Sequence, residues 1–215
     1  IVNNIKFQIN RGDKIGIIGA SGSGKSTLID IFTGLVNPSA GKIYLNNQVA
    51  ELNDRNWFNL IGYSPQFIFL ADDTIINNIA FGVDSDNLQL ESAKKAYEIA
   101  EMKNFINTST LGLKTKIGEF GVRLSGGQRQ RIGIARAVYS DPQILVLDES
   151  TSAIDIKTEE KIIDNLNSLT DKTVIIISHR LSTLKNCNKV FEIKNGNLLT
   201  KIIKKWKIFL KIIKI

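Results

Sequence analysis

The chain has 215 residues, 43% of them hydrophobic and 23% charged, so it can bury a sizeable core as one large domain or a domain with a lobe. Six of the lysines behind its net charge of +7 lie in residues 201–215, and removing them leaves 22 basic against 21 acidic residues. This distribution weakens the argument for a nucleic-acid-binding face on residues 1–200, and no nucleic-acid partner is expected. One cysteine, Cys187, excludes an internal disulfide, and no apolar run reaches the roughly 18 residues of a membrane-spanning helix.

The first predicted strand, residues 14–18, leads directly into the glycine-rich segment GASGSGKST. This segment satisfies the phosphate-loop pattern G-x-x-x-x-G-K-[ST], and a helical pattern follows it at residues 28–32. Backbone amides of such a loop wrap phosphates, Lys25 places a charge on the β/γ oxygens, and Ser26 can ligate Mg²⁺. The residues of this predicted site are Gly19, Ala20, Ser21, Gly22, Ser23, Gly24, Lys25, Ser26 and Thr27.

A further strand is predicted at residues 43–45, and Gln66 follows in the segment IGYSPQ. A glutamine amide there can touch both Mg²⁺ and an attacking water. Alone, a glutamine after a proline is an ordinary loop residue, so this assignment depends on the other motifs. From about residue 75 to 140 the apolar spacing becomes helical, which predicts a helical insert in the chain.

A second phosphate cradle is predicted where the helix at residues 127–139 begins, in the segment LSGGQRQR. Ser125, Gly126 and Gly127 offer a hydroxyl and bare backbone amides at the start of a helix. Free N–H groups and the helix dipole make such a turn a ready anion site.

Strands are also predicted at residues 144–147, 174–177 and 190–193, and the first two end in polar residues. Alternation of strand, functional loop and helix predicts an α/β fold with a mainly parallel sheet, whose ligands bind at the carboxyl ends of the strands. Asp148 is the candidate Mg²⁺ holder, Glu149 the candidate general base, and His179 the candidate contact to the γ-phosphate. The alternatives without a catalytic role are two solvated acids at a strand end and a structural histidine.

These motifs together resemble the nucleotide-binding domain of ABC transporters. They stand in that family's order: Walker A at 19–27, Q-loop at Gln66, signature at 124–128, Walker B at 144–149, D-loop at 152–155 and H-loop at His179. The resemblance implies a P-loop NTPase fold with a RecA-like core, a small antiparallel β portion and an inserted α-helical subdomain. The core would comprise about residues 1–70 and 141–200, and the subdomain about 71–140.

The resemblance also implies how two cradles are used. The signature turn of one chain, Ser125 to Gln128, would grip ATP bound with Mg²⁺ at the phosphate loop of a second nucleotide-binding domain, either an identical copy or a paralogue. Asp155 of the D-loop would lie at the seam between the two sites. Hydrolysis would then reopen the dimer.

The segment TKIGEFGVRLSGGQ resembles the exporter type, in which Glu119 would contact a transmembrane domain. We therefore expect an ATPase motor at the cytoplasmic face of the cell membrane, with the transmembrane domain fused upstream and lipids or lipid-linked saccharides as cargo. One alternative is a non-transport ABC ATPase of DNA repair, chromosome organisation or translation. Another is a regulatory domain that binds ATP without turnover.

Two features depart from the family pattern. The aromatic residue that stacks on adenine would precede Ile1, and we expect Phe7 to pack in a strand instead; the sequence begins without methionine and is expected to be an excerpt. Residues 201–215 form a basic amphipathic pattern that is typical of an interfacial helix. A truncated or frame-disturbed end is the alternative.

Overall fold

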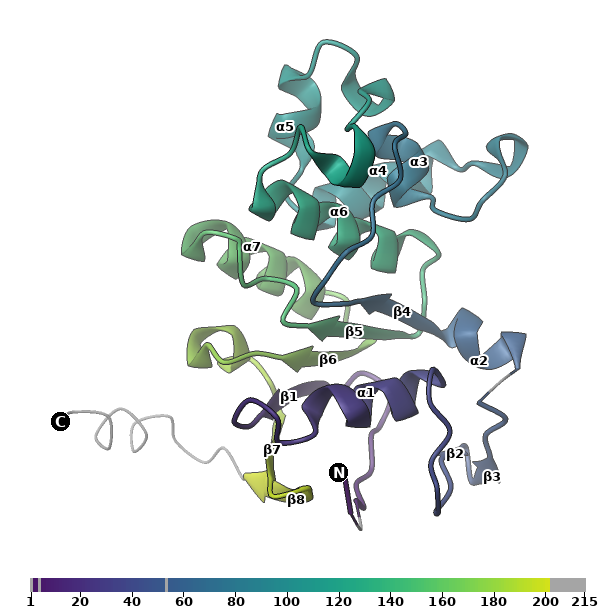
Figure 1. The fold of residues 1–215 in the computed structure, drawn as a ribbon, viewed down its shortest axis with the longest axis vertical. Coiled ribbons are helices and arrows are strands. Elements are labelled where there is room, and N and C mark those ends of the chain that lie inside the picture. The colour runs from purple at the N-terminus through teal and green to yellow at the C-terminus, as the bar shows by residue number, and fades with distance from the viewer. Residues whose placement is uncertain (1, 4, 53, 202–215) are drawn as a thin grey trace, which may run out of the picture.

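A computed structural model describes residues 2–3, 5–52 and 54–201 of the chain (Figure 1). Its main sheet has the strand order β4-β5-β6-β1-β7-β8, in which β8 runs antiparallel to β7 and all other neighbours are parallel. The strands are β1 (Lys14–Ile18), β4 (Ile61–Ser64), β5 (Ile144–Asp148), β6 (Thr173–Ile177), β7 (Lys189–Lys194) and β8 (Asn197–Lys201). The predicted α/β class with a mainly parallel sheet is confirmed, although β4 and β8 were not predicted.

The predicted strand at residues 43–45 belongs to a separate small sheet. Here β2 (Tyr44–Leu45) pairs antiparallel with β3 (Gln48–Val49). Asn46 and Asn47 form the two-residue connection, with φ of 51° and 66°. Asparagine tolerates this left-handed conformation, which two-residue hairpin turns require. The expected small antiparallel portion is therefore present.

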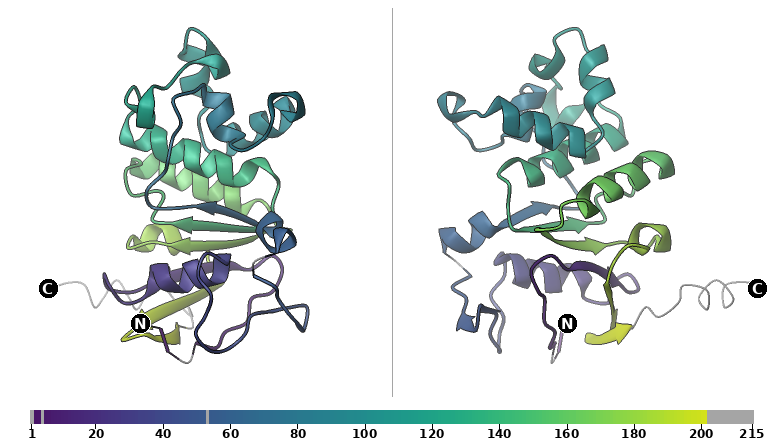
Figure 2. Two further views of the ribbon diagram at one scale, coloured as in Figure 1. Left: turned by 45° about the vertical axis from the view of Figure 1, so that its right-hand side comes forward. Right: turned by 180° about the vertical axis from the view of Figure 1, so that it is seen from behind.

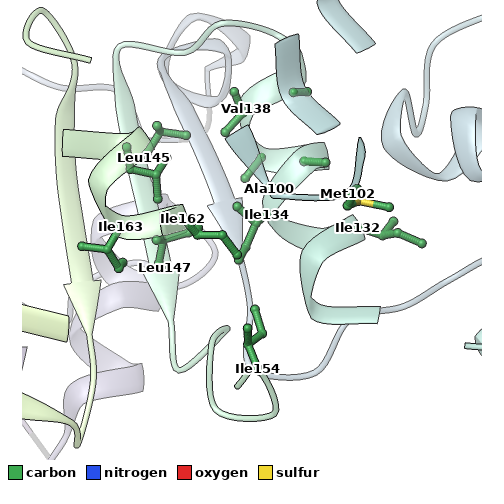
Figure 3. Packing of buried hydrophobic residues seen from close by; sticks show 14 of the residues in the cluster. Ala100, Met102, Ile132, Ile134, Val138, Leu145, Leu147, Ile154, Ile162 and Ile163 are labelled. Carbon is green, nitrogen blue, oxygen red and sulfur yellow. The ribbon is translucent and has the colours of Figure 1, made fainter. Parts of the chain in front are cut away.

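Helices cover both faces of the main sheet. Successive strand residues point to opposite sides, so the apolar side chains of the central strands need a covering layer on each face. Ile144 and Val146 face the cluster around α1 (Lys25–Thr33), whereas Leu145 and Leu147 face the cluster of α6 (Gly126–Tyr139) and α7 (Ile156–Asn167). Figure 3 shows Leu145 and Leu147 beside Ile162 and Ile163 of α7 and Ile134 of α6. The two predicted cradles, at the starts of α1 and α6, thus lie on helices that pack against opposite faces of the sheet.

The predicted helical insert comprises short helices beyond the β4 edge of the sheet and the longer helix α6, which packs against β4 and β5 (Figures 1 and 2). Helices α3 (Ile75–Ile79) and α4 (Leu90–Ile99) pack on α6, and α5 (Lys103–Thr108) follows. The helical spacing between residues 90 and 106 is interrupted at Glu101, whose φ of 54° ends α4. Its carbonyl oxygen accepts a 2.7 Å hydrogen bond from Arg131 of α6. The remaining short elements are α2 (Arg55–Leu60), η1 (Ser85–Asn87), η2 (Gly112–Lys114), η3 (Glu119–Gly121) and η4 (Leu181–Leu184).

The two ends of the chain differ from what the sequence predicted. Phe7 does pack on the core, with its ring centroid 5.3 Å from that of Phe191, but its segment is irregular and not a strand. Lys201, predicted as the start of an amphipathic tail, ends β8, which pairs with β7. The rest of that tail, residues 202–215, lies outside the described residues. No helix among the described residues is long and apolar enough to cross a membrane.

Candidate nucleotide site

The sheet order brings most of the predicted site residues to one edge. Strands β5, β6 and β1 are parallel neighbours, with Asp148 opposite Ile177 and Ile177 opposite Ile17. Their carboxyl ends therefore lie together, and the segments that follow them begin at Gly19, Glu149 and Ser178. This is the edge at which parallel α/β sheets bind ligands.

The phosphate loop has the features of an anion cradle. Gly24 starts α1 with a φ of 105°, and no side chain caps the first turn, so its N–H groups remain available. Lys25 is only 7% exposed, and its Nζ donates to the carbonyl oxygens of Gly19 at 2.9 Å and Ala20 at 3.0 Å. Ser23 Oγ is buried without a hydrogen-bond partner among the described residues. These groups fit a phosphate chain.

The other loop residues lie around this cradle. Ala20, Ser21 and Gly22 are exposed at its rim, and a Cβ on Gly22 would meet no other atom within 4 Å. Ser26 is exposed in the first turn of α1, and Thr27 beside it is half-buried. The rim therefore leaves room for a ligand to approach the backbone.

Asp148 ends β5 with its carboxyl group mostly buried, at 6% exposure. Burial raises the pKa of Asp148; the nearby carboxylates of Glu149 and Asp30 raise it further, while Lys25 and a hydrogen bond with Tyr63 lower it. Burial also raises the pKa of Tyr63, so its hydroxyl stays protonated and donates to the carboxylate. Tyr63 lies on β4 and was not singled out in the sequence.

Glu149, Gln66 and His179 form one cluster, although their positions in the sequence are far apart. Glu149 Oε1 lies 2.8 Å from His179 Nε2, and Glu149 Oε2 accepts a 3.0 Å hydrogen bond from Gln66 Nε2. The backbone of Glu149 has a φ of 48°, which turns the chain immediately after β5, and its N–H donates to Ile177 O at 3.1 Å. A carboxylate held in this way can accept a proton from a water beside it.

A Mg²⁺ ion that accompanies a nucleotide fits these residues. Asp148 supplies a buried carboxylate, Ser26 an exposed hydroxyl, and Gln66 an amide oxygen, since only its nitrogen is bonded to Glu149. The described residues contain no cluster of three or more His, Cys, Asp or Glu that could hold a metal. Nucleotide-bound Mg²⁺ needs none, because it takes most ligands from phosphates and water.

The second predicted cradle is preformed but stands apart from the first. Ser125 caps α6: its Oγ accepts from Gln128 N–H at 3.2 Å, and Gln128 Oε1 accepts from Ser125 N–H at 2.8 Å. The Ser125 hydroxyl keeps its own proton for another acceptor, and the N–H groups of Gly126 and Gly127 have no partner within the helix. Among the described residues, no hydrogen bond or ion pair joins residues 124–128 to residues 19–27.

Asp155 caps α7, where its side chain accepts a 3.0 Å hydrogen bond from Thr158 N–H. Hydrogen bonding to the side chain of Thr158, and then to its backbone N–H, lowers the pKa of Asp155, whose carboxylate is exposed. The predicted site residues therefore form one assembled half, around the phosphate loop and Glu149, and a second half made of the signature turn and Asp155.

Comparison with known proteins shows the family of the chain. The sequence profile of the family described as ABC transporter matches residues 2–152. The chain belongs to the ABC transporter family. It is 43% identical over 198 residues to the alpha-hemolysin translocation ATP-binding protein HlyB of Escherichia coli O157:H7, covering 91% of this chain and 28% of that protein. It is 40% identical over 205 residues to the ATP-dependent lipid A-core flippase of Idiomarina loihiensis, covering 92% of this chain and 34% of the flippase.

Its fold is similar to the structure of a bacterial Atm1-family ABC exporter with ATP bound. That match has a TM-score of 0.85 and 33% sequence identity, and covers 92% of this chain and 35% of the exporter chain. The predicted family and P-loop NTPase fold are confirmed, and the chain is an ABC transporter ATP-binding domain. The named relatives are transport proteins, which does not favour the DNA-repair, chromosome or translation alternative. The chain spans about a third or less of these relatives, 28% and 34%.

Proposed function

We propose that this chain is the ATP-hydrolysing motor domain of an ABC exporter. The observation that supports hydrolysis best is the Glu149 cluster, in which His179 and Gln66 hold both carboxylate oxygens at the edge of the sheet that carries the phosphate loop. A domain that only bound nucleotide would not need a general base held in this position. Glu149 would accept the proton of the attacking water, and His179 would orient Glu149 and contact the γ-phosphate.

Each remaining site residue has a role in this proposal. Residues 19–27 bind the phosphates of ATP, and Lys25 neutralises the β/γ oxygens. Asp148, Ser26 and Gln66 hold Mg²⁺, which when bound withdraws charge from the phosphate oxygens. Ser125, Gly126, Gly127 and Gln128 bind the γ-phosphate at the site of a second nucleotide-binding domain, and Asp155 lies at the seam.

The proposed transmembrane partner would dock on an aromatic surface beside Glu119. The ring centroid of Phe69 lies 6.0 Å from that of Phe81 and 6.2 Å from that of Phe120, yet all three side chains are exposed. Exposed aromatic groups of this kind are typical of protein interfaces. With its partner fused upstream, the domain would work at the cytoplasmic face of the cell membrane.

We also propose that the chain divides into a RecA-like core, about residues 1–70 and 141–200, and a helical subdomain, about residues 71–140. The packing of α3 and α4 on α6, beyond the β4 edge, supports this division. The helical part carries the signature turn together with Phe81 and Phe120 of the aromatic surface, so it would connect ATP to the membrane partner.

An ATPase assay on the purified chain tests the motor function. We expect Mg²⁺-dependent release of phosphate, and we expect Lys25→Ala to impair both ATP binding and turnover. Lys94→Ala, on the exposed part of α4, is the matched control and should behave like the unaltered chain. Absence of hydrolysis in the unaltered chain, despite ATP binding, would favour a regulatory domain.

A further inference from the structure

The turn at residues 151–154 lies between the two halves of the site. It follows Glu149, whose carbonyl oxygen accepts from Ser152 N–H at 3.2 Å. At its other end the turn touches the signature: a Cβ on Gly127 would come within 3.1 Å of Ala153 O, and one on Gly126 within 3.3 Å of the Ala153 Cβ. The turn therefore contacts both the general base segment and the signature turn of the same chain.

Gln130 fixes this turn to the signature helix. Its side chain lies on α6, is only 8% exposed, and directs both ends of its amide to the turn. Nε2 donates to Ser152 Oγ at 2.9 Å, and Oε1 accepts from Ala153 N–H at 2.7 Å. Because a buried amide is costly to leave unpaired, the turn and α6 are held in one relative position.

Arg180, which follows His179 directly in the chain, also holds this turn. Its Nη2 donates to Ser152 O at 3.0 Å and its Nη1 to Ile154 O at 3.3 Å. Nη1 also pairs at 2.6 Å with Glu159, which is 2% exposed. The other oxygen of Glu159 accepts from Thr151 Oγ1 at 2.6 Å, so the turn is bonded to the whole ion pair.

We propose that Gln130 and Arg180 are positioning residues that join the signature turn to the Glu149–His179 pair through residues 151–154. This inference rests on the proposed function, in which those two parts of one chain serve different ATP molecules. When the signature turn closes on ATP at one site, it would move the 151–154 turn with it. Through Arg180 and Glu149, that movement would change the position of the Glu149–His179 pair at the other site. The two sites of a dimer then respond cooperatively to ATP.

The test measures the ATP dependence of hydrolysis and the thermal unfolding of the purified 215-residue chain and its variants. Gln130→Ala removes both bonds to the turn. Gln130→Glu keeps two hydrogen bonds to the turn. One carboxylate oxygen can accept from Ala153 N–H, and the other can accept from the Ser152 hydroxyl, which then acts as the donor. Arg180→Lys keeps a charge against buried Glu159 but cannot reproduce the planar fork that reaches the turn.

Asn165→Ala is the matched control, because it also removes two hydrogen bonds made by a side-chain amide. Asn165 Nδ2 donates to Ile99 O at 3.2 Å and to Glu101 Oε1 at 2.9 Å, and both acceptors lie outside the 151–154 turn. We expect a Hill coefficient between 1 and about 2 for the unaltered chain, the limit for two sites. It should fall to about 1 in Gln130→Ala and Arg180→Lys, and be retained in Gln130→Glu and Asn165→Ala.

Three results would overturn the inference: a Hill coefficient of 1 in the unaltered chain, cooperativity retained in both Gln130→Ala and Arg180→Lys, or an equal loss in Asn165→Ala. If Gln130→Ala does not fold, the Hill coefficient of Arg180→Lys alone tests the inference. A chain that hydrolyses no ATP would instead overturn the proposed function, so the two failures are distinguishable.

Discussion

Glu149 combines a left-handed backbone, with a φ of 48°, and a side chain whose two oxygens are both engaged. This conformation is uncommon for a residue such as glutamate, and backbone strain of this kind clusters at functional sites. Here the conformation aims the carboxylate at His179 and Gln66, while Asp148, one residue earlier, faces the buried side near Tyr63. Two adjacent acids thus acquire different environments and different proposed roles.

Replacing Glu149 tests its role as general base. Glu149→Gln keeps the size of the side chain but removes the proton acceptor, so we expect ATP binding to persist while hydrolysis slows at least about a hundredfold. Nucleotide binding and phosphate release measure the two effects. Glu160→Gln, whose carboxylate makes a surface pair with Lys185 at 3.6 Å, should change neither. Near-normal turnover in Glu149→Gln would remove Glu149 from this role.

Asp148 lowers the stability of the domain at neutral pH, because burial raises its pKa above the ordinary value of about 3.8. A carboxyl group whose pKa is raised on folding favours the native state below the ordinary pKa, and that contribution is lost as pH rises through the folded-state pKa. Asp148→Asn should therefore raise the Tm at pH 7 without nucleotide, by about 2–4 °C per kcal/mol regained. The gain should vanish towards pH 4.

Thermal unfolding at a series of pH values checks this expectation. Asp164→Asn, on the exposed face of α7, is the control and should leave the Tm nearly unchanged at every pH. If Asp148→Asn lowered the Tm at pH 7, the carboxylate would be stabilising the fold, contrary to this account.

Motif spacing predicted a phosphate loop, since phosphate binding demands particular residues in a local order. It did not predict Tyr63, Gln130 or Arg180, whose partners lie far along the chain. Their positions become meaningful only when the sheet order is known, although Gln130 stands within the quoted segment LSGGQRQR and Arg180 follows His179 directly.

Strand β4 shows how tightly the elements fit around α6. Gly62 pairs with Leu145 of β5, and a Cβ at Gly62 would overlap the carbonyl oxygen of Ala137 in α6. Gly62→Ala should therefore lower the free energy of unfolding by about 1–3 kcal/mol, as overpacking commonly does. Gly41→Ala, where the added methyl meets no atom within 4 Å, should cost only about 1 kcal/mol for its φ of 91°. Urea unfolding measures both, and a smaller cost for Gly62→Ala than for Gly41→Ala would contradict the close approach of β4 to α6.

Continuous apolar runs predicted β1, β5 and β6 because these strands are buried on both faces. Strand β4 has four residues, includes Gly62, and is only partly buried, so its composition gives no such run. The break between α4 and α5 was also hidden, since Glu101 is not a residue that usually ends a helix. Tertiary contacts decide both cases, through Ala137 for β4 and Arg131 for Glu101.

At the scale of the whole molecule, the two predicted phosphate cradles lie at the starts of helices that pack on opposite faces of one sheet. The phosphate loop precedes α1 and the signature turn precedes α6, and the two helices belong to different hydrophobic clusters. One chain therefore cannot apply both cradles to one ATP without separating these helices from the sheet. In the proposed function, a second nucleotide-binding domain would supply the other cradle without any such change.

The most direct measurement is sedimentation of the Glu149→Gln chain with ATP, with ADP and without nucleotide. ATP should convert the chain to a species of twice the mass, and ADP should not, because only ATP carries the γ-phosphate that the signature turn is proposed to bind. Adding Gly127→Asp, which places a negative charge in that turn, should abolish the heavier species. A chain that remains a single molecule with ATP, and whose unaltered form hydrolyses ATP at full rate as a single molecule, would contradict the account.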